Sequence, residues 1–159
     1  MQAYRIVVGF DGSEGGIRAL DWAVAHAARH GGTVQAVTAL HWTEPELGTD
    51  APAEHERTAR RSLEEAAIAA RAPYPQVAVS TQTVSGSAAE MLTRTAADAD
   101  LLVLGSHGHS RLFHAVLGSV AEACIREGTC PVVVIPAPRV AAETETAGKI
   151  TAPISTAVY

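Results

Sequence analysis

The 159-residue chain has few aromatic residues and no long hydrophobic run. Aromatic side chains make up 4% of the sequence, so a core must be built mainly from Ala, Val, Leu and Ile. No run approaches the roughly 18 apolar residues that a membrane-spanning helix needs. The first residues show no basic leader followed by an apolar stretch, as a signal peptide would. These absences predict a cytoplasmic protein without membrane contacts.

Cysteine is also scarce, because Cys124 and Cys130 are the only two in the chain. Two cysteines are too few for a disulfide scaffold, and their spacing is not that of a redox pair. We expect two small hydrophobic residues near a sheet in a reducing compartment, with a regulatory thiol as the alternative.

Positive charge is limited to 12 Lys and Arg residues against 17 Asp and Glu, which gives a formal net charge of −5. Binding to nucleic acid requires clustered Lys and Arg, so we predict no nucleic-acid partner. A small anionic ligand is still compatible with this charge, because backbone N–H groups bind phosphate without any basic side chain.

Two common catalytic motifs are missing as well. The chain contains no G-x-x-x-x-G-K-[ST] sequence, which excludes the P-loop mechanism of ATP hydrolysis. It contains no G-x-S-x-G sequence in a hydrolase setting either.

The residues that are present alternate between short apolar runs and longer helical patterns. Five runs rich in Val, Leu and Ile have the length of strands, and they cover residues 4–10, 33–40, 76–84, 100–105 and 131–136. Helical patterns lie between them, at about 13–30, at 53–72, and from Ser87 and Ser119 onward. This alternation predicts an α/β fold with an open five-stranded, mostly parallel sheet and helices on both faces.

Local sequence signals mark several helix ends. Gly31 and Gly32 stand in the usual C-cap position of the first helix. Ser87 and Ser119 each begin an S-x-x-E sequence, which predicts a capping box at the start of the third and fourth helices. Residues 1–136 therefore form one predicted domain, followed by a tail of little periodicity over residues 137–159. The spaced Ile150, Ile154 and Val158 are compatible with a peptide that packs on the body or on a partner.

The most informative stretch is GSHGHSRLFHAVLGS, residues 105–119, between the fourth strand and the fourth helix. Ligands of open parallel sheets bind beyond the carboxyl ends of the strands. Gly105 and Gly108 make a turn whose amides face inward without interference from a Cβ atom. Gly118 and Ser119 stand where a helix N-terminus offers unpaired N–H donors to an anion. On spacing alone, a phosphate site and a ligand-free turn with a capping serine are equally compatible with this stretch.

The spacing G-x2-G-x9-G-[ST] of Gly105, Gly108, Gly118 and Ser119 resembles the nucleotide-binding pattern of the universal stress protein family. The opening IVVGFDGS, with Asp11, and the closing GSVAEACIREGTCPVVVIP are similar to the same family. The resemblance covers about residues 4–136. It implies a Rossmann-like fold of the adenine nucleotide alpha hydrolase type, with strand order 3-2-1-4-5.

The resemblance also implies ATP as ligand and assigns ten residues to its site. Adenine and ribose would lie near Gly9, Asp11 and Ala39, and the main chain of Leu104 and Gly105 would border the ribose. The phosphates would lie against His107, Gly108, Gly118, Ser119 and Val120. Asp11 would bind the ribose hydroxyls or, through water, a Mg²⁺ ion, because a bare carboxylate would repel the triphosphate.

His107 stands where other members of the family often carry Arg, so the attraction for a triphosphate would depend on pH. Arg111 in the same loop is a candidate for the missing cation. Both residues bear on affinity for the nucleotide.

The implied function is that of a binding or regulatory module in the stress response, and no residue is assigned a catalytic role. A slow ATPase or a nucleotidyl- or phosphoryl-transfer enzyme is one alternative, and a nucleotide-free interaction protein is another. The family covers its last strand by antiparallel pairing with a second subunit, which implies a homodimer through residues 131–136.

Overall fold

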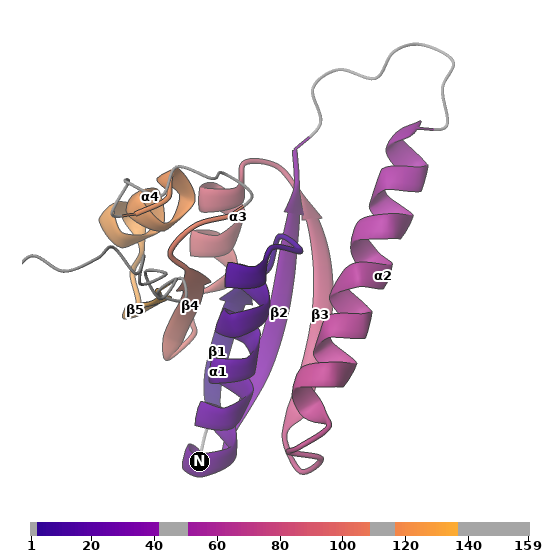
Figure 1. Cartoon of the computed structure of the whole chain (residues 1–159). Coiled ribbons are helices and arrows are strands. Elements are labelled where there is room, and N and C mark those ends of the chain that lie inside the picture. Colours follow the sequence, from indigo (N-terminus) through magenta and orange to yellow (C-terminus); the bar gives the residue numbers. More distant parts are fainter. Residues whose placement is uncertain (1–2, 42–50, 109–116, 137–159) are drawn as a thin grey trace, which may run out of the picture.

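The structure, a computed structural model, describes residues 3–41, 51–108 and 117–136. The described elements alternate between strand and helix along the chain (Figure 1). They are β1 (Tyr4–Gly9), α1 (Glu14–His30), β2 (Gly32–Leu40), α2 (Ala51–Arg71), β3 (Ala78–Ser85), α3 (Ala88–Thr95), β4 (Leu101–Gly105), α4 (Ser119–Glu127) and β5 (Val132–Ile135). The predicted tail over 137–159 lies outside the described residues.

The five strands form one sheet in the order β3-β2-β1-β4-β5, and every neighbouring pair is parallel. The predicted α/β fold and strand order are therefore confirmed. Because β1 lies in the middle, with β2 on one side and β4 on the other, the strand order reverses there. A ligand site is expected beyond the carboxyl ends of these strands.

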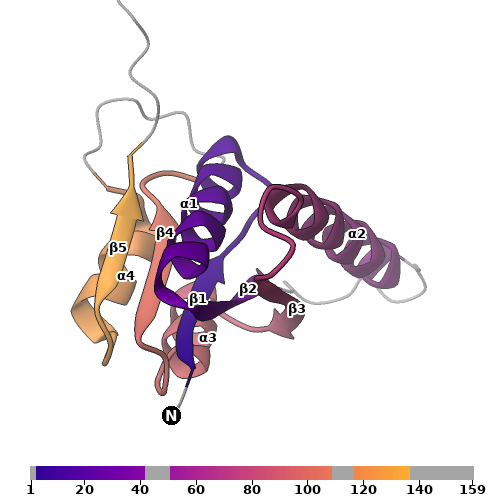
Figure 2. The ribbon, with the colours of Figure 1, turned by 90° about the horizontal axis from the view of Figure 1, so that it is seen from below.

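Side chains point alternately to the two faces of the sheet along each strand, and they form one hydrophobic core on each face. Ile6 and Val8 of β1 belong to a core with residues of α1 and α2, and Val7 belongs to a second core with residues of α3 and α4. Figure 2 shows these two helical layers on opposite sides of the sheet. Cys124 is fully buried in the second core and Cys130 packs against it, which confirms that both are small hydrophobic residues near the sheet.

The ends of the helices agree only in part with the sequence signals. Gly31 caps α1 in a left-handed conformation with φ of 73°, and its N–H donates to the Ala27 carbonyl, as predicted. Both predicted capping boxes are wrong. Ser87 is the N-cap of α3 but its side chain makes no capping bond, and Ser119 is already the first helical residue after the N-cap Gly118.

None of the helices in the described part of the chain is long and apolar enough to cross a membrane.

Candidate functional site

A cavity of about 290 Å³ lies where the carboxyl ends of β1, β2 and β4 meet the N-terminal ends of α1, α3 and α4. Its walls come from chain segments that are far apart in the sequence. All ten residues assigned from the sequence line this cavity: Gly9, Asp11, Ala39, Leu104, Gly105, His107, Gly108, Gly118, Ser119 and Val120.

Sequence reasoning missed several further lining residues. Ala88 and Leu92 of α3 contribute apolar wall opposite the loop after β4. No local signal could have found them, because their place in the wall depends on how α3 packs on the sheet. Ser13 and Ser106 also line the cavity, and each lies within two residues of a position that the sequence did single out.

Asp11 is held in place by the first turn of α1. Its Oδ1 atom accepts hydrogen bonds from the Ser13 amide at 2.9 Å and from Ser13 Oγ at 2.5 Å. Ser13 Oγ in turn accepts a hydrogen bond from the Gly16 amide at 3.1 Å, which caps the helix. The carboxylate therefore lies against the partial positive charge of a helix N-terminus, which lowers the cost of a negative group in an anion site.

The loop after β4 approaches this turn so closely that only glycine fits at several positions. A Cβ atom on Gly108 would clash with Asp11 Oδ2. A Cβ atom on Gly105 would clash with the Gly15 carbonyl carbon, at 2.7 Å. Gly105 and Gly108, two of the three glycines of the motif, therefore let the loop main chain lie directly against Asp11 and α1.

The N-terminus of α4 opens on the same cavity. Gly118 has extended backbone angles, its amide donates to the Ser106 carbonyl at 2.7 Å, and no side chain caps the helix. Ser119 and Val120, the first two helical residues, are exposed. Because the first amides of a helix lack intrahelical acceptors, this end presents donors to an anion.

Positive side chains are few around the cavity. No Lys or Arg belongs to its lining within the described residues, and His107 is the one basic side chain there. Its Nδ1 atom lies 3.0 Å from Ser106 Oγ. Arg111, the other predicted cation, lies outside the described residues. Any phosphate held by the described lining must therefore be bound mainly by main-chain donors.

The residues that the structure describes contain no group of three or more His, Cys, Asp or Glu side chains able to hold a metal ion. Asp11 is the only carboxylate in the described lining of the cavity. One carboxylate suits a Mg²⁺ ion that is bound mostly by water and by the phosphates of a nucleotide.

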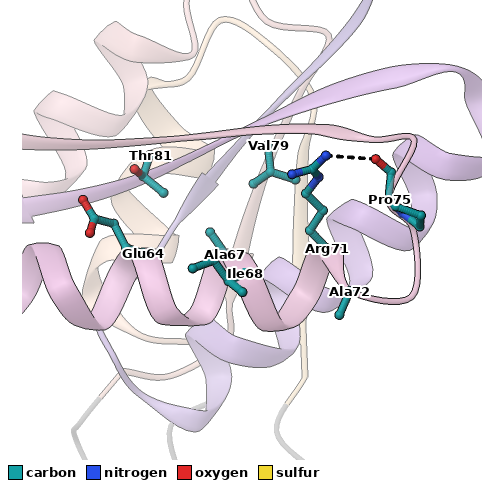
Figure 3. Close-up of a pocket in the computed structure, with 8 residues that line it drawn as sticks. All are labelled: Glu64, Ala67, Ile68, Arg71, Ala72, Pro75, Val79 and Thr81. Carbon is teal, nitrogen blue, oxygen red and sulfur yellow. Dashed lines mark hydrogen bonds between the residues drawn. The ribbon is translucent and has the colours of Figure 1, made fainter.

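A second hollow, of about 530 Å³, lies between α2 and β3 on another part of the molecule (Figure 3). Arg71 is the one cation in the described part of its lining, and it is already hydrogen-bonded: Nε donates to the Val77 carbonyl at 3.1 Å and a terminal nitrogen donates to the Pro75 carbonyl at 3.0 Å. Although this hollow is larger, its described lining includes no residue at a helix N-terminus, and its cation Arg71 already bonds main-chain carbonyls. The smaller cavity is therefore the candidate site.

Comparison with known proteins points in the same direction. A sequence model described as the universal stress protein family matches residues 3–136. Universal stress protein Rv2624c of Mycobacterium tuberculosis is 32% identical over 133 residues, which cover 82% of this chain and 47% of that protein. The chain thus spans about half the length of the relatives it matches.

Solved structures share the fold. A universal stress protein in complex with cAMP is 29% identical, with a TM-score of 0.63, and the match covers 85% of this chain and 98% of that one. The universal stress protein from Archaeoglobus fulgidus in complex with dAMP is 20% identical, with a TM-score of 0.61 and coverage of 84% and 98%. At that identity the second likeness concerns the fold alone.

Proposed function

The chain belongs to the universal stress protein family, and on this basis we propose that it is a dimeric, ATP-binding module that acts in a stress response by binding rather than by catalysis. The observation that carries the proposal is the convergence of ten residues from four separate chain segments on one cavity. Several of them, Gly105, Gly108 and Gly118 among them, offer main chain to a ligand.

In the proposed complex, each part of the nucleotide meets a different wall. Adenine and ribose lie near Gly9, Asp11 and Ala39 and beside the main chain of Leu104 and Gly105. The phosphates lie against His107 and Gly108 and against Gly118 at the start of α4, where Ser119 and Val120 supply amides. The family relative solved with cAMP supports an adenine nucleotide as the ligand class.

The bond network around Asp11 limits what this residue does. Oδ1 accepts two hydrogen bonds from Ser13, and Oδ2 lies next to Gly108 on the wall of the cavity. We assign the Asp11 carboxylate to the ribose hydroxyls or to a water-bound Mg²⁺, since either places a donor or a cation between the carboxylate and the phosphates.

The remaining parts of the proposal concern assembly and location. Residues 1–136 form the nucleotide-binding domain, and residues 131–136, with edge strand β5, pair with the same residues of a second copy. A cytoplasmic location and the absence of a nucleic-acid partner stay predictions from the composition of the chain.

Thermal unfolding with and without ATP·Mg²⁺ tests the proposal. At about 100 times its Kd, the ligand should raise Tm by about 5–10 °C. Gly118→Asp should abolish this shift, because it places a carboxylate among the phosphate-binding amides. Gly118→Ala is the matched control. It brings a Cβ atom to the same 3.1 Å contact with the Ser106 carbonyl but adds no charge, so it should keep most of the shift.

A wild-type protein whose Tm does not respond to millimolar ATP·Mg²⁺ would contradict nucleotide binding and favour a module that acts by protein contact alone. Steady release of phosphate that is lost in Asp11→Ala would contradict the binding-only role and favour the enzyme.

A further inference from the structure

The groove between α2 and β3 has no part in the proposed function. It combines an exposed isoleucine with the outermost strand of the sheet. Ile68 on α2 is 71% exposed, the largest exposure among the bulky apolar side chains that the structure describes as exposed. Ala67, Ala72, Pro75 and Val79 line the same groove (Figure 3). An exposed isoleucine next to an outer strand offers an apolar contact to a segment that pairs with that strand.

The strand beside the groove lacks the usual protection of a sheet edge. β3 is the outermost strand next to β2, and its eight residues include no charged side chain and no proline. Edge strands are commonly protected by Lys, Pro or a bulge, because their unpaired main chain otherwise accepts another strand. Within the described residues, no strand pairs with the outer side of β3.

The register identifies which amides on this edge are open. The Gly86 amide, directly after β3, donates to the Leu40 carbonyl of β2 at 2.9 Å. In a parallel pair the N–H and C=O of one residue point to the same side, and successive residues alternate. The amides of Thr81 and Thr83 therefore point away from β2, toward the open edge.

The chain itself contains a segment suited to this edge. Residues 150–159, ITAPISTAVY, carry no charged side chain, and Ile154, Thr156 and Val158 alternate as in a strand. The family match ends at residue 136, so this segment is an addition to the shared domain. Charged residues of the tail are confined to 137–149, before the segment.

The connecting residues are long enough. The thirteen residues 137–149 span up to ~43 Å when extended, at roughly 3.3 Å per residue. The five-stranded sheet is about 19 Å across from β5 to β3, with roughly 4.8 Å between neighbouring strands. The segment can therefore reach the opposite edge of its own molecule.

We propose that residues 150–159 dock in the groove between α2 and β3 of the same chain and pair with the outer edge of β3. The main chain of the segment bonds the open amides of Thr81 and Thr83, and Ile154 packs beside Ile68. The docked segment thereby covers an unprotected edge strand by β-augmentation.

Amide hydrogen exchange of the full chain, followed by NMR, tests this pairing. In the wild type, the Thr81 and Thr83 amides should be protected. Ile154→Asp in the segment and Ile68→Asp in the groove should each speed their exchange by about tenfold or more, because each removes the burial of one isoleucine. Ile68 is mostly exposed in the domain, so its substitution should leave the domain folded, which circular dichroism checks.

Two control variants carry the same charge elsewhere. Val140→Asp lies in the tail before the segment, and Ile17→Asp lies on α1, where Ile17 is 44% exposed. Neither should change exchange at Thr81 or Thr83.

Three results would overturn the proposal. The first is free exchange of both amides in the wild type, and the second is equal protection in wild type and Ile154→Asp. The third is protection that rises with protein concentration together with a larger assembly that Ile154→Asp disrupts, because it would make a second copy the occupant.

Discussion

Gly15 and Gly105 lie against each other where the first turn of α1 meets the end of β4. A Cβ atom on Gly15 would lie 2.5 Å from the His107 carbonyl oxygen, which is closer than real contacts allow. The loop that lines the cavity is therefore positioned by a residue outside the cavity lining. The sequence motif contains no sign of this, because Gly15 is not part of the nucleotide-binding spacing.

Gly15→Ala should consequently displace the loop around His107. We expect a loss of about 1–3 kcal/mol in the free energy of unfolding, as for other overpacked sites, and weaker binding of ATP. Urea unfolding and calorimetric titration measure the two effects. Glu14→Ala, an exposed neighbour in the same turn, is the control and should keep ATP affinity. Unchanged affinity in Gly15→Ala would show that the contact does not position the loop.

His26 on α1 makes the stability of the protein depend on pH. Burial, then His30 and Arg29, hold the pKa of His26 below its ordinary value. Its ring stacks on Trp22 at 4.6 Å and on His30 at 4.1 Å between centroids, and Tyr4 of β1 lies 5.9 Å away. Because the folded pKa is lower than the unfolded one, the unfolded state takes up a proton first as the pH falls.

The free energy of unfolding should therefore decrease as the pH falls from about 7.5 through the ordinary histidine pKa of about 6.5. His26→Gln should make this decrease smaller. Urea unfolding at a series of pH values measures it, with His55→Gln on the exposed surface of α2 as the control. An identical pH dependence in wild type and His26→Gln would contradict the assignment.

At the scale of elements, the apolar runs predicted all five strands, with ends within about two residues of the observed bounds. Their order came from the family resemblance, since no run specifies its neighbours. The capping boxes failed because an S-x-x-E pattern does not determine which residue leaves the helical conformation. At α4 that residue is Gly118, whose extended backbone moves the helix start by one position.

The open edge of β5 makes the proposed dimer testable with one backbone change. The Ser106 amide donates to the Ile135 carbonyl, and the Leu102 amide donates to the Pro131 carbonyl, so these two carbonyls face β4. By alternation, the N–H of Val134 faces the open side. Val134→Pro should remove the hydrogen bond that the Val134 N–H donates to the second subunit in the proposed dimer. It should leave the β4–β5 pairing intact.

Light scattering over a concentration series should show a dimer for the wild type and a monomer for Val134→Pro. Val134→Ile keeps the N–H and should stay dimeric. A dimer that persists in Val134→Pro would place the interface elsewhere.

At the scale of the whole molecule, the parallel order of the strands brings the ends of β1, β2 and β4 to one edge, and this gathers the ten assigned residues around a single cavity. Motif spacing could predict the residues on the loop after β4 because they are close in sequence. It could not predict the wall from α3, or the support of Asp11 by Ser13, because both arise from packing between distant segments.

In the proposed complex, main-chain amides between β4 and α4 bind the phosphates of a nucleotide. An NMR titration of the full chain with ATP·Mg²⁺ tests this most directly. The largest shifts should fall on the amides of residues 105–108 and 118–120, with smaller ones at the ends of β1 and β2. If ATP·Mg²⁺ saturates the protein without shifts in these two segments, or with shifts confined to α2 and β3, phosphate binding by these amides is contradicted.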